Sequence, residues 1–110
     1  MGELQEIVSV IMPAYNAARY LEEAVASVLA QTWQNWELII IEDASSDGTW
    51  QLVNMLAKRD ARIRILRNQN NLGAAKSRNQ GVTEARGDWI AFLDSDDVWE
   101  PEKLAAHIEF

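Results

Sequence analysis

Cysteine is absent from the 110 residues, and histidine occurs only once. Without cysteine the chain has no disulfide framework, no thiolate nucleophile and no thiolate zinc site. A single histidine cannot build a multi-histidine metal centre. The metal chemistry that this composition leaves open is therefore carboxylate chemistry.

Positive charge is scarce, because 10 Lys plus Arg stand against 17 Asp plus Glu and give a formal net charge of −7. Each phosphate contact needs a cation, so this balance disfavours nucleic acids and anionic membranes as partners. Long hydrophobic runs are also missing, since none approaches the roughly 18–20 residues that span a bilayer. The first residues are acidic where a signal peptide begins basic. We therefore expect a cytoplasmic protein with no nucleic-acid partner.

The length of the chain suits one domain rather than two. A chain of this size hides about 60–70% of its extended surface, which is enough for one sheet covered by helices. It is too short for a nucleotide domain plus a separate substrate domain.

Short β-branched stretches alternate with longer amphipathic ones, as in parallel βα units. This alternation predicts four strands and four helices. The strands are expected at 7–12, 37–42, 63–67 and 88–93, and the helices at 17–31, 48–59, 74–85 and from Pro101 onward, with Asn16 as the cap of the first helix. The expected fold is a three-layer, Rossmann-like α/β fold with a mostly parallel sheet. A strand order of 3-2-1-4 would place a ligand site at the switch point beyond the carboxyl ends of the first and fourth strands.

Three carboxylates follow the fourth predicted strand, in the segment Asp94-Ser95-Asp96-Asp97. Two unit charges about 4 Å apart repel by roughly 4 kcal/mol at an effective dielectric near 20. A divalent cation such as Mg²⁺ or Mn²⁺ offsets this repulsion, because it prefers oxygen ligands and is commonly shared with substrate phosphates. The alternative is that these side chains cap a local turn and are solvated.

A second acidic segment, Glu42 to Thr49, follows the second predicted strand. Ser46, Asp47 and Gly48 are interpreted as turn and cap residues of the next helix. Asp43 differs, because a carboxylate directly after a buried strand needs a partner or a ligand. An N–H or O–H group of a base or a ribose would be a suitable donor.

Other residues at the same edge of the sheet have two interpretations each. Tyr15 could form an apolar wall for a planar base, or it could pack against the first helix. Gly73, Ala74 and Ala75 could bring a helix N-terminus close to an anion. Lys76 and Arg78 could then contact a phosphate, or they could lie on a solvated helix face.

Taken together, four segments resemble the N-terminal half of the family 2 glycosyltransferases of GT-A fold. They are PAYN at 13–16, EDASSDGT at 42–49, NLGAAKSRNQG at 71–81 and DSDD at 94–97. The resemblance runs from about Ile7 to the end of the chain, and it depends on the joint pattern rather than on any single motif. It implies a site for a nucleotide-sugar donor, with a UDP-sugar as the expected ligand and Mn²⁺ or Mg²⁺ as the cofactor.

The resemblance also implies a role for particular residues. Asp43 would contact the base, Asp94 the ribose and sugar side of the donor, and Asp96 the metal ion, to which Asp94 is a second candidate ligand. The remaining residues implied in donor binding are Pro13, Ala14 and Tyr15, which would line the nucleotide pocket, and Gly73, Lys76 and Arg78, on the helix that closes it.

Family members transfer sugars with inversion and take their general base from the second half of the domain. Residues 1–110 are therefore expected to be a truncated domain, the donor-binding part, without the acceptor-binding half and without the catalytic base. The longer enzyme could be peripheral to a membrane. In the alternative reading the chain is a non-catalytic nucleotide-binding or self-associating module, and the apolar fourth strand would form a homo-oligomer through an exposed sheet edge. Trp99, beside the acidic segment, is the tryptophan best placed to contact a sugar.

Overall fold

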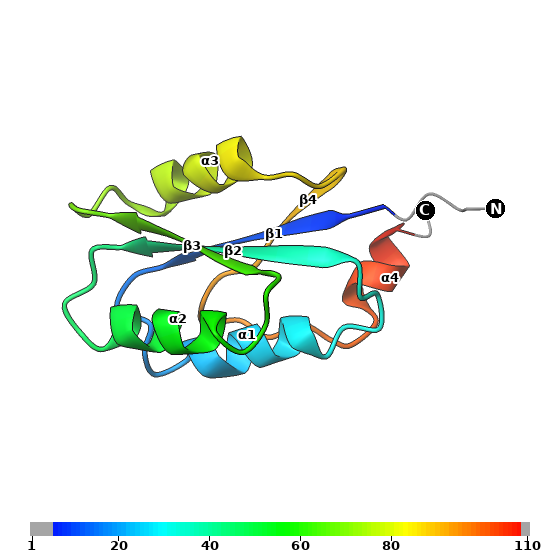
Figure 1. The fold of residues 1–110 in the computed structure, drawn as a ribbon, viewed down its shortest axis with the longest axis horizontal. Coiled ribbons are helices and arrows are strands. Elements are labelled where there is room, and N and C mark those ends of the chain that lie inside the picture. The colour runs from blue at the N-terminus through cyan, green and yellow to red at the C-terminus, as the bar shows by residue number, and fades with distance from the viewer. Residues whose placement is uncertain (1–5, 109–110) are drawn as a thin grey trace.

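The computed structural model describes residues 6–108, and it has the three layers that the sequence predicts (Figure 1). One parallel sheet has the order β3-β2-β1-β4, with α1 and α2 on one face and α3 on the other. The strands are β1 (Val8–Ala14), β2 (Trp36–Asp43), β3 (Ile63–Asn68) and β4 (Trp89–Phe92). The helices are α1 (Leu21–Leu29), α2 (Thr49–Ala57), α3 (Ala74–Glu84) and α4 (Lys103–Ile108).

β2 is apolar along most of its length because helices cover both of its faces. Leu38, Ile39, Ile40 and Ile41 are fully buried. β2 pairs with β1 on one side and with β3 on the other, in parallel register. The centre of the sheet therefore has no solvent-facing side, as the run of isoleucines predicts.

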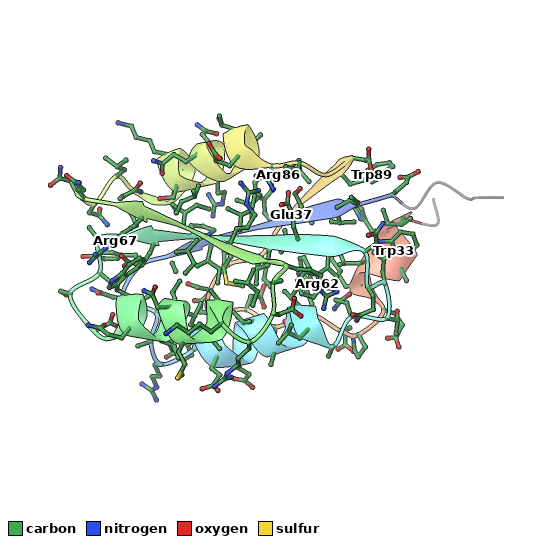
Figure 2. All side chains as sticks on the ribbon, in the orientation of Figure 1. Trp33, Glu37, Arg62, Arg67, Arg86 and Trp89 are labelled. Atoms are coloured by element: carbon green, nitrogen blue, oxygen red, sulfur yellow. The ribbon has the colours of Figure 1, made fainter. Side chains whose placement is uncertain are left out.

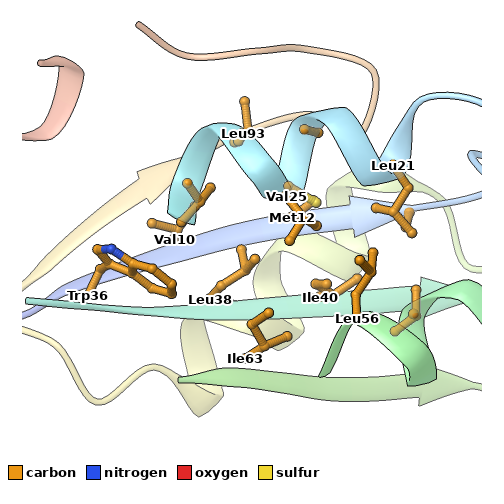
Figure 3. Close-up of a cluster of buried hydrophobic side chains, with 14 of the residues drawn as sticks. Val10, Met12, Leu21, Val25, Trp36, Leu38, Ile40, Leu56, Ile63 and Leu93 are labelled. Carbon is orange, nitrogen blue, oxygen red and sulfur yellow. The ribbon is translucent and has the colours of Figure 1, made fainter. Parts of the chain in front are cut away.

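The main core lies between the sheet and the pair α1 and α2 (Figure 3). Met12 and Ile40 from the sheet meet Leu21 and Val25 from α1 and Leu56 from α2. Leu21 and Val25 lie four residues apart, so they share the helix face that packs against the sheet.

α3 covers the opposite face across a smaller apolar cluster that includes Ile11 and Ile41. Gly81 makes this close packing possible. A Cβ atom built at position 81 would lie 2.5 Å from Ile11 Cγ2 and 2.9 Å from Ile41 Cδ1. Only glycine therefore allows α3 to lie this near the sheet.

Two helix starts differ from the sequence prediction. α1 begins at Leu21 rather than at residue 17, and Asn16 does not cap it, because Asn16 has φ 48° and bonds the β2–α2 connection instead. The N-cap position of α1 is Tyr20, which makes no side-chain capping bond. Pro101 lies in a turn before α4, whose first residue is Lys103.

β4 is an edge strand, and its apolar side chains are open to solvent. Trp89 is 41% exposed and Phe92 is 51% exposed. The predicted apolar edge is therefore present in the described part of the chain. None of the helices within residues 6–108 combines the length and the hydropathy that crossing a membrane requires.

Candidate functional site

A cavity of about 390 Å³ lies at the carboxyl ends of β1 and β4, where the strand order reverses. It opens between the β1–α1 connection, the first turn of α3 and the segment after β4. Its lining residues are Pro13, Ala14, Tyr15, Asn16, Ala17, Tyr20, Asp43, Ala74, Arg78, Asp94, Ser95 and Asp96. The cavity thus lies at the edge of the sheet where the switch-point rule places a ligand site.

Most of the candidate site residues meet at this cavity. Pro13, Ala14, Tyr15, Asp43, Arg78, Asp94 and Asp96 line it. Gly73 and Lys76 are not among the lining residues, although both are close in sequence to Ala74, which is.

Helix geometry separates Lys76 from Arg78. Ala74 and Arg78 are four residues apart and share one face of α3, whereas Lys76 lies about half a turn away. Lys76 is exposed and lies outside the cavity, whereas Arg78 lines the cavity and brings a positive charge to it. Gly73, with φ 93°, adopts the left-handed backbone that turns the chain into α3. Ala74 lines the cavity in agreement with the expectation that the start of this helix approaches an anion, whereas sequence reasoning assigned no binding role to the other lining residues, Asn16, Ala17, Tyr20 and Ser95.

Asp43 ends β2 and is 2% exposed, so its carboxylate needs partners. The protein supplies four. Oδ1 accepts hydrogen bonds from Asn68 Nδ2 at 2.8 Å and from the Leu72 backbone N–H at 2.9 Å. Oδ2 accepts from Asn71 Nδ2 at 3.0 Å and from the Gly73 backbone N–H at 2.9 Å. The two oxygens thus hold the whole β3–α3 connection against the end of β2.

These bonds decide the ionisation of Asp43. Burial opposes the charged form, but the hydrogen bonds from Leu72, Asn68 and Gly73 outweigh burial and hold the pKa of the carboxyl below its ordinary value. A carboxylate has about four lone-pair positions, and four protein donors occupy them. The partner that the sequence demands for Asp43 is therefore present within the chain itself.

Asn16 connects the two other loops at this edge of the sheet. Its backbone N–H donates to Ser45 Oγ at 2.9 Å, and its Oδ1 accepts from the Ser46 backbone N–H at 2.8 Å. Next to it, the Ala17 backbone N–H donates to Thr49 Oγ1 at 2.8 Å. The β1–α1 and β2–α2 connections are thus fastened together, and Tyr15 stays half exposed at the cavity.

The acidic segment after β4 forms a tight turn, in which the Asp97 backbone N–H donates to Asp94 O at 3.0 Å. Asp94 Oδ1 accepts from Arg78 Nη2 at 3.1 Å across the cavity. Asp96 also lines the cavity, whereas Asp97 does not. Trp99 packs against the main core instead of lining the cavity, so the expectation of a sugar contact at Trp99 is not supported by its position.

Asp94 and Asp96 are the two carboxylates of the acidic segment that line the cavity. Within residues 6–108 there is no group of three or more His, Cys, Asp or Glu side chains arranged to hold a metal ion. Two carboxylates at one cavity nevertheless fit Mg²⁺ or Mn²⁺, since these ions usually take one or two protein carboxylates and complete their shell with water and phosphate oxygens. The donor set fits a metal ion that arrives with its substrate.

Comparison with known proteins identifies relatives of this chain. The family model described as "Glycosyl transferase family 2" matches residues 9–110. The Escherichia coli protein named UDP-Glc:alpha-D-GlcNAc-diphosphoundecaprenol beta-1,3-glucosyltransferase WfgD is 46% identical over 102 residues, which are 93% of this chain and 40% of WfgD. The chain spans less than half the length of the curated relatives that it matches best.

Solved structures resemble the fold closely. Staphylococcus aureus TarS 1–349 in complex with UDP has a TM-score of 0.84 at 30% identity, over 93% of this chain and 31% of TarS. The mannosyltransferase PcManGT from Pyrobaculum calidifontis, in complex with GDP-Man and Mn²⁺, has a TM-score of 0.86 at 26% identity, over 93% of this chain and 31% of PcManGT. The fold is therefore the GT-A type, and the chain belongs to glycosyltransferase family 2.

Proposed function

We propose that this chain forms the donor-binding part of an enzyme that transfers a sugar from a nucleoside diphosphate to an acceptor, with inversion and with a divalent cation. The observation that carries the proposal is the cavity at the switch point, where an exposed tyrosine, one arginine and two aspartates of the acidic segment come together. The donor would be a UDP-sugar, since the name of WfgD specifies UDP-Glc and the TarS complex contains UDP.

The lining residues divide naturally between a base end and a phosphate end. Pro13, Ala14 and Tyr15 offer an apolar surface against which a planar base can lie. Asp43 and Gly73 would shape that end through the β3–α3 connection, which the Asp43 carboxylate holds. Lys76, exposed on α3, could then meet a phosphate only at the outer rim, so Arg78 is the stronger candidate for this contact.

Charge explains why a cation is needed. Three carboxylates line the cavity, and Arg78 is the only cationic side chain among its lining residues. A diphosphate entering this cavity would be repelled unless positive charge came with it. Asp96 and Asp94 would hold Mn²⁺ or Mg²⁺, and the bound ion would offset the charge that develops on the diphosphate leaving group.

We assign residues 1–110 to donor binding and place the acceptor site and the general base elsewhere, because the chain covers only about two fifths of WfgD. The acceptor named for WfgD is alpha-D-GlcNAc-diphosphoundecaprenol, whose long isoprenoid chain supports the proposal that the enzyme works at a membrane surface.

Calorimetric titration with UDP, in the presence and in the absence of Mn²⁺, tests the proposal. We expect saturable binding that tightens by about tenfold or more when Mn²⁺ is present, because the ion bridges the carboxylates and the diphosphate. GDP titrated in the same way tests the choice of base. Equal UDP affinity with and without the metal would contradict the proposal.

Asp96→Asn and Asp97→Asn form a matched pair for the same titration. Both remove one charge from the acidic segment, but only Asp96 lines the cavity. Asp97 accepts a hydrogen bond from the Val98 backbone through Oδ1, which asparagine retains. Asp96→Asn should therefore abolish the gain from Mn²⁺, while Asp97→Asn should preserve most of it.

The exposed edge of β4 supports a second candidate, self-association of a non-catalytic module. Trp89 and Phe92 present apolar surface beside unpaired backbone groups, a combination that favours strand pairing between copies. Sedimentation at rising concentration tests this candidate. A monomer at every concentration would eliminate it, and a dimer that Phe92→Lys dissociates would support it.

A further inference from the structure

Gln31 lies directly beyond α1, at the end of the molecule opposite to the cavity, and it is 1% exposed. The chain after β4 leaves the cavity, crosses the α1 side of the sheet and arrives at α4 beside Gln31 (Figure 1). Gln31 is therefore remote from the acidic segment in space. It lies beside residues 100–104, which follow that segment in the chain.

Both ends of the Gln31 side-chain amide are bonded to that stretch. Nε2 donates to Glu100 O at 2.7 Å, and Oε1 accepts from the Leu104 backbone N–H at 2.9 Å. Nε2 also donates to Ser27 O at 3.1 Å, within its own helix end. One buried side chain thus fastens the residues on both sides of the Pro101 turn to α1.

The neighbouring backbone strengthens this attachment. The Thr32 backbone N–H donates to Pro101 O at 2.9 Å. Pro101 has no N–H group, so its carbonyl is the only backbone group through which the turn can bond at that residue. The turn between residues 100 and 104 is therefore held at three successive points by the end of α1.

The acidic segment itself has few other anchors. Upstream, the Leu93 backbone N–H donates to Ile11 O at 3.1 Å, and downstream Trp99 packs against the main core. Between them Asp94 is more than half exposed, and its only side-chain ion pair within the described residues is the one with Arg78. The path of this segment thus depends on how firmly its two ends are held.

We propose that Gln31 is a positioning residue for the acidic segment, fixing the downstream end of the stretch that carries Asp94 and Asp96. This inference rests on the proposed function, because it takes these two carboxylates as the site of the divalent cation. Gln31 touches neither the cavity nor its contents. Its effect is to reduce the number of conformations that the acidic segment samples before a ligand binds.

Gln31→Met tests the proposal, because methionine has a similar length and no polar group to bond Glu100 O or the Leu104 N–H. Ser27→Ala is the matched control. It removes a buried hydrogen bond of 2.7 Å from Ser27 Oγ to Ala24 O in the same helix and leaves the 100–104 turn untouched. Gln31→Asn, which keeps both amide groups on a side chain one methylene shorter, serves as the milder variant if Gln31→Met does not fold.

Two measurements are made on each variant, namely amide hydrogen exchange at Leu104 and UDP affinity with and without Mn²⁺. In Gln31→Met we expect exchange at Leu104 to accelerate about tenfold or more, and the affinity gained from Mn²⁺ to fall about tenfold, with metal-free UDP affinity unchanged. Ser27→Ala should change neither quantity. Gln31→Asn should lie between the wild type and Gln31→Met in both.

The outcomes separate this proposal from the proposed function. A Gln31→Met protein that is less stable but keeps the full gain from Mn²⁺ overturns the positioning role alone. A wild-type chain that gains nothing from Mn²⁺ overturns the proposed function, and the positioning role with it. An equal loss of the gain in Ser27→Ala also overturns the positioning role, because general destabilisation would then explain both.

Discussion

Glu37 and Asp43 stand near the two ends of β2 and face the same side of the sheet, since they are six residues apart in a strand whose side chains alternate. Both are buried carboxylates, 9% and 2% exposed. Each fastens two separate parts of the chain. They differ in what balances their charge, and the difference distinguishes the amino end of the sheet from the carboxyl end, where the cavity lies.

Glu37 has a charged partner. Its Oε1 accepts from Arg64 Nη1 at 2.9 Å, while Oε2 accepts from Ser9 Oγ at 2.6 Å and from the Arg86 backbone N–H at 2.7 Å. Figure 2 shows Glu37 beside Arg86, at the connection between α3 and β4. Burial raises the pKa of Glu37, but the hydrogen bonds and the Arg64 charge together outweigh burial. The pKa therefore lies below its ordinary value, and the group stays ionised. The amino end of the sheet is thus neutralised by its own side chains.

Asp43 has no such partner. Its four donors are uncharged amides, and no ion pair joins it to a Lys or Arg within the described residues. The backbone N–H groups at the start of α3 stabilise the charge as a helix N-terminus does, without cancelling it. The carboxyl end therefore keeps an uncompensated negative charge at the cavity, which favours a cationic ligand there.

The largest expected effect is that of Asp43→Asn. An amide at this position would direct an N–H₂ group at donors that now meet an oxygen, so the free energy of unfolding should fall by about 3 kcal/mol and UDP affinity by about tenfold. Urea denaturation and calorimetry measure the two quantities. Asn71→Ala, which removes one donor and no charge, should cost less than half as much. Unchanged stability of Asp43→Asn would contradict the assigned hydrogen bonds.

Glu37→Gln should have a smaller effect, confined to stability. It breaks the ion pair with Arg64 but keeps an acceptor oxygen, and a loss of about 2 kcal/mol is expected. UDP affinity should stay within about twofold of the wild type, because the site lies at the other end of the sheet. A parallel loss of affinity would mean that the two ends are not independent.

Arg78→Gln tests the charge balance at the carboxyl end. Arg78 pairs with Asp94, so its removal should free Asp94 and tighten binding of Mn²⁺ alone by about threefold. The same change should weaken binding of UDP with Mn²⁺ by about tenfold, because the diphosphate loses its only cationic lining residue. Electron paramagnetic resonance of Mn²⁺ and calorimetry follow the two affinities. If the affinity for Mn²⁺ alone and the affinity for UDP with Mn²⁺ changed in the same direction, Arg78 would not serve both Asp94 and the diphosphate.

The smallest expected effect is a change in how steeply the free energy of unfolding falls as the pH is lowered. The pKa values of Asp43 and Glu37 are both lowered in the folded state, so their contribution to stability is fully present above the ordinary carboxyl pKa of about 4 and is lost as the pH falls through the folded values. Denaturant titrations from about pH 6 to about pH 3 should show a shallower decline in Asp43→Asn and in Glu37→Gln than in the wild type. An unchanged slope in either variant would mean that its carboxyl has an ordinary pKa.

The succession of strands and helices could be predicted because it follows from local patterns, and the place of the cavity follows once the strand order 3-2-1-4 is assumed. The isoleucine run of β2 marks a strand covered on both faces, and polar segments after each strand mark the carboxyl edge. The start of α1 could not be predicted, because asparagine is equally common as a helix cap and as a loop residue with positive φ. Its actual role depends on Ser45 and Ser46, which are distant in sequence.

Pairings over long sequence distances were equally inaccessible. The donors to Asp43 come from residues 25 to 30 positions later, and Gln31 meets Glu100 across 69 positions. Composition identifies Asp43 as a residue that needs partners but does not say that the chain provides them. The choice between Lys76 and Arg78 required the exact start of α3, which Gly73 sets through its left-handed backbone.

The absence of a side chain at Gly81 also allows the close approach of the helix that carries Arg78. Arg78 lies one turn before Gly81 on α3, so any change that lifts the helix from the sheet also moves Arg78 away from Asp94. A Cβ atom at position 81 would have to push Ile11 and Ile41 aside or raise α3. If α3 is raised, Gly81→Ala lengthens the span between Arg78 and the acidic segment without altering the residues that line the cavity.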